Sequence, residues 1–146
     1  NHILKINSNS YIPINNEFLP VGEIEKITNT PFDFTNSRKI SEQINFDNQQ
    51  LKIAKGYDHC YVLEKEKEIA VEISEKISGR KLTISTNQPG VQLYTGNNLR
   101  GKFKKNQGLC LETQNFPNAP NIKSFPSSDL KANRNYYSKT SYHFIF

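Results

Sequence analysis

The sequence predicts an all-β fold, a sandwich of mostly antiparallel strands in a single domain. Most apolar residues recur with a period of two, which is the pattern of a half-buried strand. The runs with this alternation are short, and Gly, Pro, Asn and Ser separate them. Many short strands joined by turn-rich links are typical of two packed sheets. The length of 146 residues corresponds to one domain.

The first third of the chain contains extended segments and one helical turn. A strand is predicted over His2–Ile6, followed by an Asn/Ser turn and a short extended run over Tyr11–Ile14. Further extended segments are expected over Gly22–Thr28 and over Thr30–Phe34, where proline disfavours helix at the residue before it. Only Ser37–Ile44 has the character of a helical turn.

The remainder of the chain alternates more regularly. Strands are predicted over Cys60–Leu63, Ile69–Ile73, Lys81–Thr86, Val91–Thr95, Leu109–Thr113 and Lys139–Phe146. The run Glu64–Glu68 alternates in charge and is interpreted as a solvated hairpin turn. Asn87–Gly90 has strong turn chemistry. Asn115–Ser128 is rich in Pro, Asn and Ser and is too long for a tight turn.

Composition excludes several classes of function. The net charge of +5 permits weak attraction to anionic surfaces, but the Lys and Arg residues are not clustered as in a nucleic-acid-binding domain. A basic nucleic-acid-binding domain therefore remains a reading supported by net charge alone. No signal peptide or membrane-length apolar run occurs, and the three histidines lack the paired spacing of metal ligands. We expect no metal, no cofactor, no nucleic acid and no membrane partner.

The chain has two cysteines, Cys60 and Cys110, which is too few for a disulfide framework. Both lie in apolar strand-like runs, where buried free thiols are common. This usage fits a reducing compartment, so a cytoplasmic location is expected.

Strand alternation separates polar from aliphatic side chains in two of the predicted strands. Val91 and Leu93 point to one face of their strand, whereas Gln92 points to the other. The strand Leu109–Thr113 likewise places Glu112 opposite its leucines. If the two strands are neighbours, Gln92 and Glu112 line one polar face suited to sugar hydroxyls. The alternative is that both are ordinary solvent-facing residues.

A second candidate cluster, Gly56–His59, precedes a predicted strand. It is interpreted either as a turn with local capping hydrogen bonds or as part of a binding site.

These clusters occur in an order that resembles the galactose mutarotase (aldose 1-epimerase) family. Gly56–His59 resembles the family's GxDH motif, and Thr86–Asn97, TNQPGVQLYTGN, resembles its TxQPGVQxYTGN signature. Gly108–Asn121, GLCLETQNFPNAPN, resembles its GxCLETQxxPDAxN signature. Leu19–Glu23 and Pro31–Phe34 resemble its PTGE and FDxR segments. The resemblance extends over the whole chain.

The resemblance implies a galactose mutarotase-like β-sandwich (supersandwich) and a function. Such enzymes interconvert the α and β anomers of an aldohexose such as galactose or glucose by general acid–base ring opening. By motif match, Glu112 is the catalytic base, and Asp58 and Gln92 bind the sugar. No metal or cofactor is implied.

The chain departs from the family pattern in ways that affect this reading. The NHxYFNL-type motif of the catalytic acid, a second substrate histidine and an arginine are absent. Residues 1–146 are therefore expected to be the C-terminal portion of a single aldose 1-epimerase domain, with its N-terminal portion missing. The chain would then pair with that portion or self-associate, and be inactive or weak alone. The alternative is a noncatalytic carbohydrate-binding or interaction module. The link between Asn97 and Gly108 is also shorter than is usual in the family.

Overall fold

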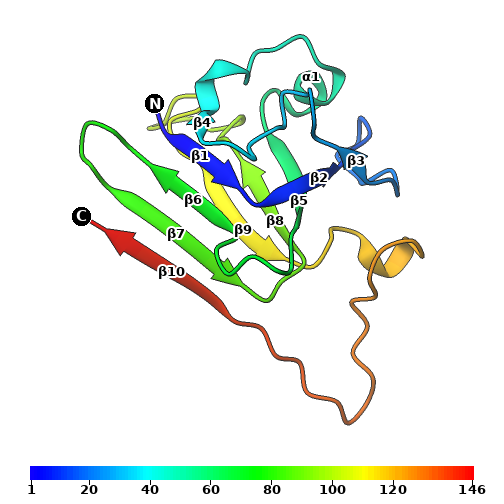
Figure 1. Ribbon diagram of the computed structural model, residues 1–146. Helices are drawn as coiled ribbons and strands as arrows, with labels where there is room; N and C mark the ends of the chain where they lie inside the picture. Colours follow the sequence, from blue (N-terminus) through cyan, green and yellow to red (C-terminus); the bar gives the residue numbers. More distant parts are fainter.

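The computed structural model describes residues 1–146, which form two five-stranded sheets packed face to face (Figure 1). The first sheet, sheet A, consists of β1 (Ile3–Ile6), β4 (Arg38–Lys39), β6 (Val71–Ser74), β7 (Lys81–Thr86) and β10 (Thr140–Ile145). The second sheet, sheet B, consists of β2 (Ser8–Ile12), β3 (Glu25–Lys26), β5 (Asp58–Leu63), β8 (Gly90–Tyr94) and β9 (Cys110–Gln114).

The strand order is β10-β7-β6-β1-β4 in sheet A and β3-β2-β5-β8-β9 in sheet B. Every ladder in both sheets is antiparallel. The predicted all-β sandwich of mostly antiparallel strands is therefore confirmed.

A single apolar core fills the space between the sheets, with a cluster of 17 buried residues. Its members on the strands include Leu4, Ile6, Tyr61, Val71, Ile73, Ile84, Val91 and Leu93. Burying one large aliphatic side chain stabilises the fold by about 1.5–3 kcal/mol, so this layer holds the two sheets together.

The α-helix lies outside the segment predicted to be helical. Within Ser37–Ile44 the structure has β4 and a single 3₁₀ turn at Ile40–Glu42, whereas α1 spans Gln49–Ala54. The Asn48 side-chain oxygen accepts hydrogen bonds from the first backbone N–H groups of α1 and caps it. A helix of six residues is too short to show a 3.6-residue apolar pattern, which is why the sequence did not predict it.

Two strand boundaries also differ from the prediction. The Asn/Ser turn expected after Ile6 is wrong, because β2 already begins at Ser8. Ser8 Oγ lies 2.7 and 2.6 Å from the backbone oxygens of Ser10 and Val62, which share its single proton, at an irregularity in the β2–β5 register. Of the extended run Gly22–Thr28, only β3 is paired with a neighbouring strand.

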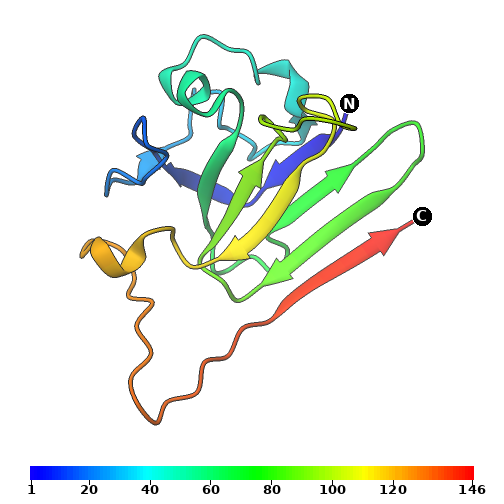
Figure 2. The ribbon, with the colours of Figure 1, turned by 180° about the vertical axis from the view of Figure 1, so that it is seen from behind.

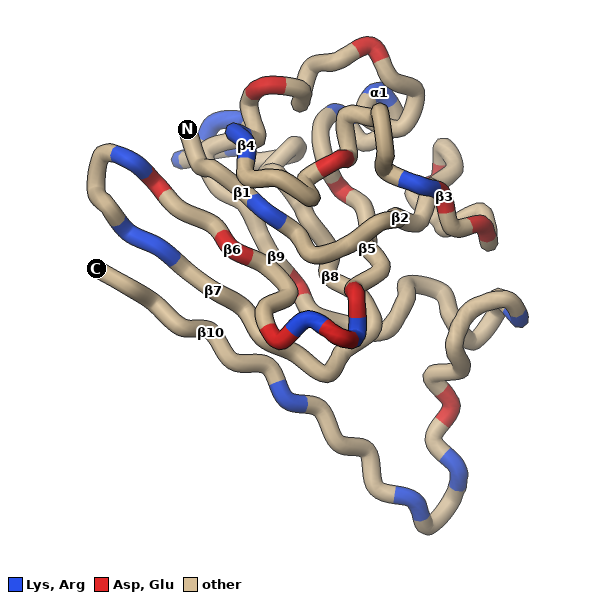
Figure 3. The backbone as a smooth tube through the Cα atoms, in the orientation of Figure 1, with Lys and Arg blue, Asp and Glu red and all other residues tan.

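The charged run Glu64–Glu68 is exposed as predicted, but the prediction of a hairpin was wrong. It connects β5 of sheet B to β6 of sheet A, and the alternating charges follow one another along this crossing in Figure 3. Charged side chains suit this position because the link runs over the surface between the sheets.

The last strand reaches sheet A by a long path. After β9 the chain makes a 3₁₀ turn at Ala119–Asn121, swings away from the sandwich, and returns as β10 alongside β7 (Figures 1 and 2). No helix of the structure is long and apolar enough to span a membrane.

Candidate functional site

The outer face of sheet B, turned away from sheet A, carries the three residues assigned by sequence to a sugar site. Gln92 on β8 is the register partner of Glu112 on β9, and Asp58 on β5 is the register partner of Tyr94 on β8. Directly opposed residues of an antiparallel pair share a face. Leu93 points the other way, into the core, so Asp58, Gln92 and Glu112 all project outward.

Asp58 and Gln92 are in direct contact on this face. The Gln92 Nε2 atom donates a hydrogen bond to Asp58 Oδ1 at 2.8 Å. This bond fixes the orientation of the amide, because reversing it would bring two oxygens together. Gln92 Oε1 is buried and has no donor within the chain. The strands thus present two carboxylates and an amide oxygen, all hydrogen-bond acceptors, which match a ligand rich in hydroxyl donors.

A buried hydrogen-bond network at the end of β8 holds the start of β5. Thr95 Oγ1 accepts from the Tyr57 backbone N–H at 3.0 Å and donates to Asn97 Oδ1 at 2.7 Å. Asn97 Nδ2 in turn donates to the backbone oxygens of Ala54 and Tyr57 at 2.8 and 2.9 Å. A Cβ on Gly56 would meet Asn97 Oδ1 at 2.3 Å, so only glycine fits there. Gly56, Thr95 and Asn97, which belong to the GxDH and YTGN motifs, therefore help to position Asp58.

His59, the residue after Asp58, points into the protein. Its ring is fully buried and packs edge-on against Tyr11 and Phe32. Burial lowers the pKa of His59 to about 3, so the imidazole is neutral at physiological pH. His59 is therefore unsuited to acid catalysis on the outer face.

An apolar cluster covers the other end of the same face. Phe116, Ala119 and Phe125, from the segment after β9, pack over Ile12 and Cys60. Gln92, Tyr94 and Glu112 are not members of this cluster.

The two cysteines differ in environment. Cys60 is buried as expected, and burial raises the pKa of its thiol to about 12. The expectation of a buried thiol is wrong for Cys110, which is exposed on the outer face as the register partner of Tyr94. The alternation of β9 explains this, because Cys110 shares the polar side of the strand with Glu112.

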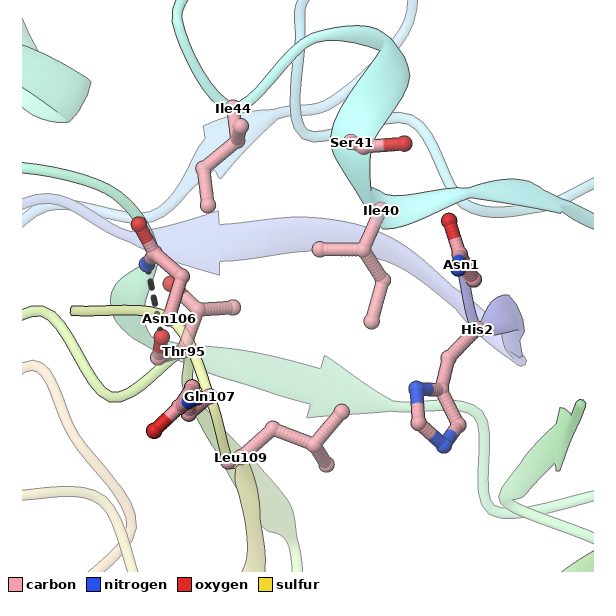
Figure 4. Close-up of a pocket in the computed structure, with 10 residues that line it drawn as sticks. Asn1, His2, Ile40, Ser41, Ile44, Thr95, Asn106, Gln107 and Leu109 are labelled. Carbon is pink, nitrogen blue, oxygen red and sulfur yellow. Dashed lines mark hydrogen bonds between the residues drawn. The ribbon is translucent and has the colours of Figure 1, made fainter. Parts of the chain in front are cut away.

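The other two histidines lie away from the three candidate residues. His143 on β10 is the register partner of Thr83, on the outer face of sheet A. His2 borders a cavity of about 540 Å³ at the end of the sandwich, where Ile40, Ile44 and Leu109 also point inward (Figure 4). No group of three or more His, Cys, Asp or Glu side chains is arranged to hold a metal ion.

Some supporting residues were not identified from the sequence as functional. The sequence indicated Thr95 and Asn97 only as part of the TxQPGVQxYTGN signature and predicted no separate role for them. It predicted no role for Gln50, which contacts His59. Their contacts to other segments of the chain join positions 9 to 43 residues apart. Contacts of this kind leave no local periodic signal. The resemblance to the GxDH and YTGN motifs was the only available indication.

Comparisons with known proteins agree with this architecture. The family profile described as "Aldose 1-epimerase" matches residues 1–143. The galactose mutarotase of Sus scrofa is 36% identical over 149 residues, covering 95% of this chain and 42% of the relative. The aldose 1-epimerase of Escherichia coli K12 is 31% identical over 157 residues, covering 99% and 45%. The chain thus spans less than half the length of these relatives.

Solved structures give the same result. The GalM/aldose epimerase homologue from C. elegans superposes with a TM-score of 0.84 at 26% identity, covering 99% of this chain and 45% of that one. The galactose 1-epimerase from Lactobacillus acidophilus NCFM superposes with a TM-score of 0.74 at 28% identity, covering 80% and 36%. Profile, sequence and fold lead to one conclusion: this chain belongs to the aldose 1-epimerase family.

Proposed function

We propose that the chain supplies the base and part of the sugar site of an aldose 1-epimerase acting on galactose or glucose. The observation that carries the proposal is the common outer face of Asp58, Gln92 and Glu112 on three adjacent strands. The curated relatives named above are called galactose mutarotase and aldose 1-epimerase, which supports the same reaction class.

The proposed mechanism is general acid–base catalysis of ring opening. Glu112 removes the proton of the C1 hydroxyl as a second group protonates the ring oxygen. The C1–O5 bond breaks, the C1 carbonyl rotates, and the reverse steps close the ring on its other face. Asp58 and the free Gln92 oxygen accept hydrogen bonds from sugar hydroxyls and hold C1 against Glu112. A positioned base contributes about 10²–10⁴-fold to such a reaction.

The proton donor is proposed to come from outside this chain. His59 faces the core, His2 lies at the end of the sandwich and His143 lies on the other sheet. The relatives are more than twice as long as this chain, so we propose that an N-terminal portion of the family fold supplies the acid. A second copy of the chain is the competing partner.

A noncatalytic carbohydrate-binding module is the second candidate function. The absence of any histidine from the outer face near Glu112 favours it. Such a module would bind sugar through Asp58 and Gln92 without converting the anomers.

Polarimetry of freshly dissolved α-galactose separates the candidates. The chain is assayed alone and with the N-terminal portion of the Sus scrofa relative added in trans, with size-exclusion chromatography to identify the complex. We expect mutarotation from the complex and its loss by about 10²–10⁴-fold in Glu112→Gln. Glu72→Gln, on the outer face of sheet A, is the matched control and should be unchanged. Sugar binding without mutarotation in the complex would establish the module.

A further inference from the structure

The ladder between β2 and β5 stops just before the candidate site. Its last register pair is Ile12 with Cys60. Continuing the register by two residues would place Ile14 opposite Asp58. Pro13, between Ile12 and Ile14, has no N–H group to donate, and no backbone hydrogen bond joins Ile14 to Asp58. The start of β5, which carries Asp58, therefore lacks a backbone partner on its β2 side.

The side chain of Gln50, on α1, takes the place of that partner for Ile14. Its Oε1 accepts from the Ile14 N–H at 2.8 Å, and its Nε2 donates to the Ile14 carbonyl oxygen at 3.0 Å. These two bonds imitate one rung of an antiparallel ladder. They also fix which end of the amide is oxygen.

His59 completes the rung on the Asp58 side. Its Nδ1 accepts from the Asp58 backbone N–H at 3.1 Å, and its Nε2 lies 3.2 Å from Gln50 Oε1. Because Gln50 Oε1 can only accept, His59 Nε2 must carry the proton and Nδ1 the lone pair. Both ring nitrogens are thus engaged, and the ring packs edge-on against the stacked rings of Tyr11 and Phe32.

We propose that His59, held by Gln50, is a positioning residue for Asp58, forming a side-chain rung where the β2–β5 ladder ends. The hydrogen bonds run from Ile14 through Gln50 and His59 to the Asp58 backbone, and from the Asp58 carboxylate to Gln92. The sugar-orienting role of Asp58 rests on the proposed function. The rung itself is a property of the chain that can be measured without sugar.

The first experiment is ¹⁵N NMR of the full chain at neutral pH without ligand. His59 should be a neutral imidazole protonated at Nε2, and the Asp58 amide should exchange slowly with solvent. In His59→Phe, which keeps an aromatic ring but loses both hydrogen bonds, Asp58 exchange should accelerate. His59→Asn places an acceptor near the Nδ1 position and should restore part of the protection. An Nδ1-protonated or charged His59, or unchanged exchange in His59→Phe, would overturn the proposal.

The second experiment measures galactose affinity by ligand-observed NMR. Loss of the rung should weaken binding about ten-fold in His59→Phe, with partial recovery in His59→Asn. In the complex with mutarotase activity, KM should rise more than kcat falls. Equal affinity of the wild type and His59→Phe would refute the positioning role.

The two experiments keep the proposals distinguishable. If the wild-type chain binds no galactose alone or in complex, the proposed function fails, and the tautomer and Asp58 exchange still decide the rung. If His59→Phe does not fold, Gln50→Leu replaces it, because this change removes both contacts to Ile14 and the contact to His59. Slow Asp58 exchange in Gln50→Leu together with undiminished galactose binding would then contradict the proposal.

Discussion

The outer face of sheet B around Asp58 and the β10 edge of sheet A are supported in opposite ways. Behind Asp58 lie the buried Thr95–Asn97 network and the ring of His59. On β10, Tyr142 and Phe144 are the register partners of core-facing Ile84 and Leu82, yet they remain 48% and 59% exposed. The first region is held in place by contacts within this chain, whereas the second is a largely exposed apolar face.

The edge strands also differ in how they are protected. β3 and β4 have two residues each, all of them charged, which is a common protection against unwanted strand pairing. β10 has six residues and no Asp, Glu, Lys or Arg, and its outer edge is unpaired. Contacts within this chain therefore hold the candidate site, whereas the apolar side chains of β10 remain exposed.

The largest expected effect comes from breaking the support of Asp58 at Gly56. In Gly56→Ala, the new Cβ would lie 2.3 Å from Asn97 Oδ1, and the φ of +143° disfavours a side chain. We expect a loss of about 3 kcal/mol or more in the free energy of unfolding, measured by urea denaturation. Gly79→Ala is the matched control, since its φ of +71° is also positive but its Cβ would meet nothing within 4 Å. It should cost about 1–2 kcal/mol, and equal losses in both variants would contradict the steric argument.

Asn97→Ala tests the network without adding a clash. It leaves the Ala54 backbone oxygen without the donor seen in the structure, whereas the Tyr57 oxygen keeps its bond from the Thr95 backbone N–H. An unsatisfied buried group costs about 1–3 kcal/mol, so a loss near 2 kcal/mol is expected in urea denaturation. Asn98→Ala, at an exposed neighbouring position, is the control and should change stability little. A neutral Asn97→Ala would show that the network is not needed.

Lowering the pH should reduce the free energy of unfolding through the buried His59. Its pKa falls from 6.5 to about 3 on folding because it is buried, so between these values the unfolded chain binds more protons. This contribution to stability is complete above pH 6.5 and is lost progressively as the pH falls toward 3. The stability difference between the wild type and His59→Phe should therefore shrink by on the order of 1 kcal/mol between pH 7 and about 5.5. Parallel pH profiles of the two proteins would rule this out.

The smallest effect on stability is expected at β10. Phe144→Ser changes a side chain that is already 59% exposed, so the free energy of unfolding should move by only about 0.5 kcal/mol. The proposed association with an N-terminal portion or with a second copy should nevertheless weaken, as measured by analytical ultracentrifugation. Unchanged association would show that this face is not an interface.

The sequence predicted what depends on local alternation. Gln92 and Glu112 were placed on polar strand faces because the side-chain period of two acts within a few residues. It did not predict α1, whose six residues are defined by the Asn48 cap, nor β4, which has only two residues. The pairing of Ile14 with Gln50 joins positions 36 residues apart, and no periodic pattern encodes it. Such contacts arise only when the sheets are assembled.

The loop that joins β8 to β9 is closed at its base. The Gly96 carbonyl oxygen accepts from the backbone N–H groups of Leu99 and Asn106 at 3.3 and 3.0 Å, and Asn106 Nδ2 donates to the Thr95 carbonyl oxygen at 2.7 Å. The residues between these anchors can change in number at little entropic cost, because loop closure depends only weakly on length. We therefore expect insertions and deletions there to leave Gln92 opposite Glu112. The chain thus has a segment that protein engineering can diversify beside the candidate site without moving the strands that form it.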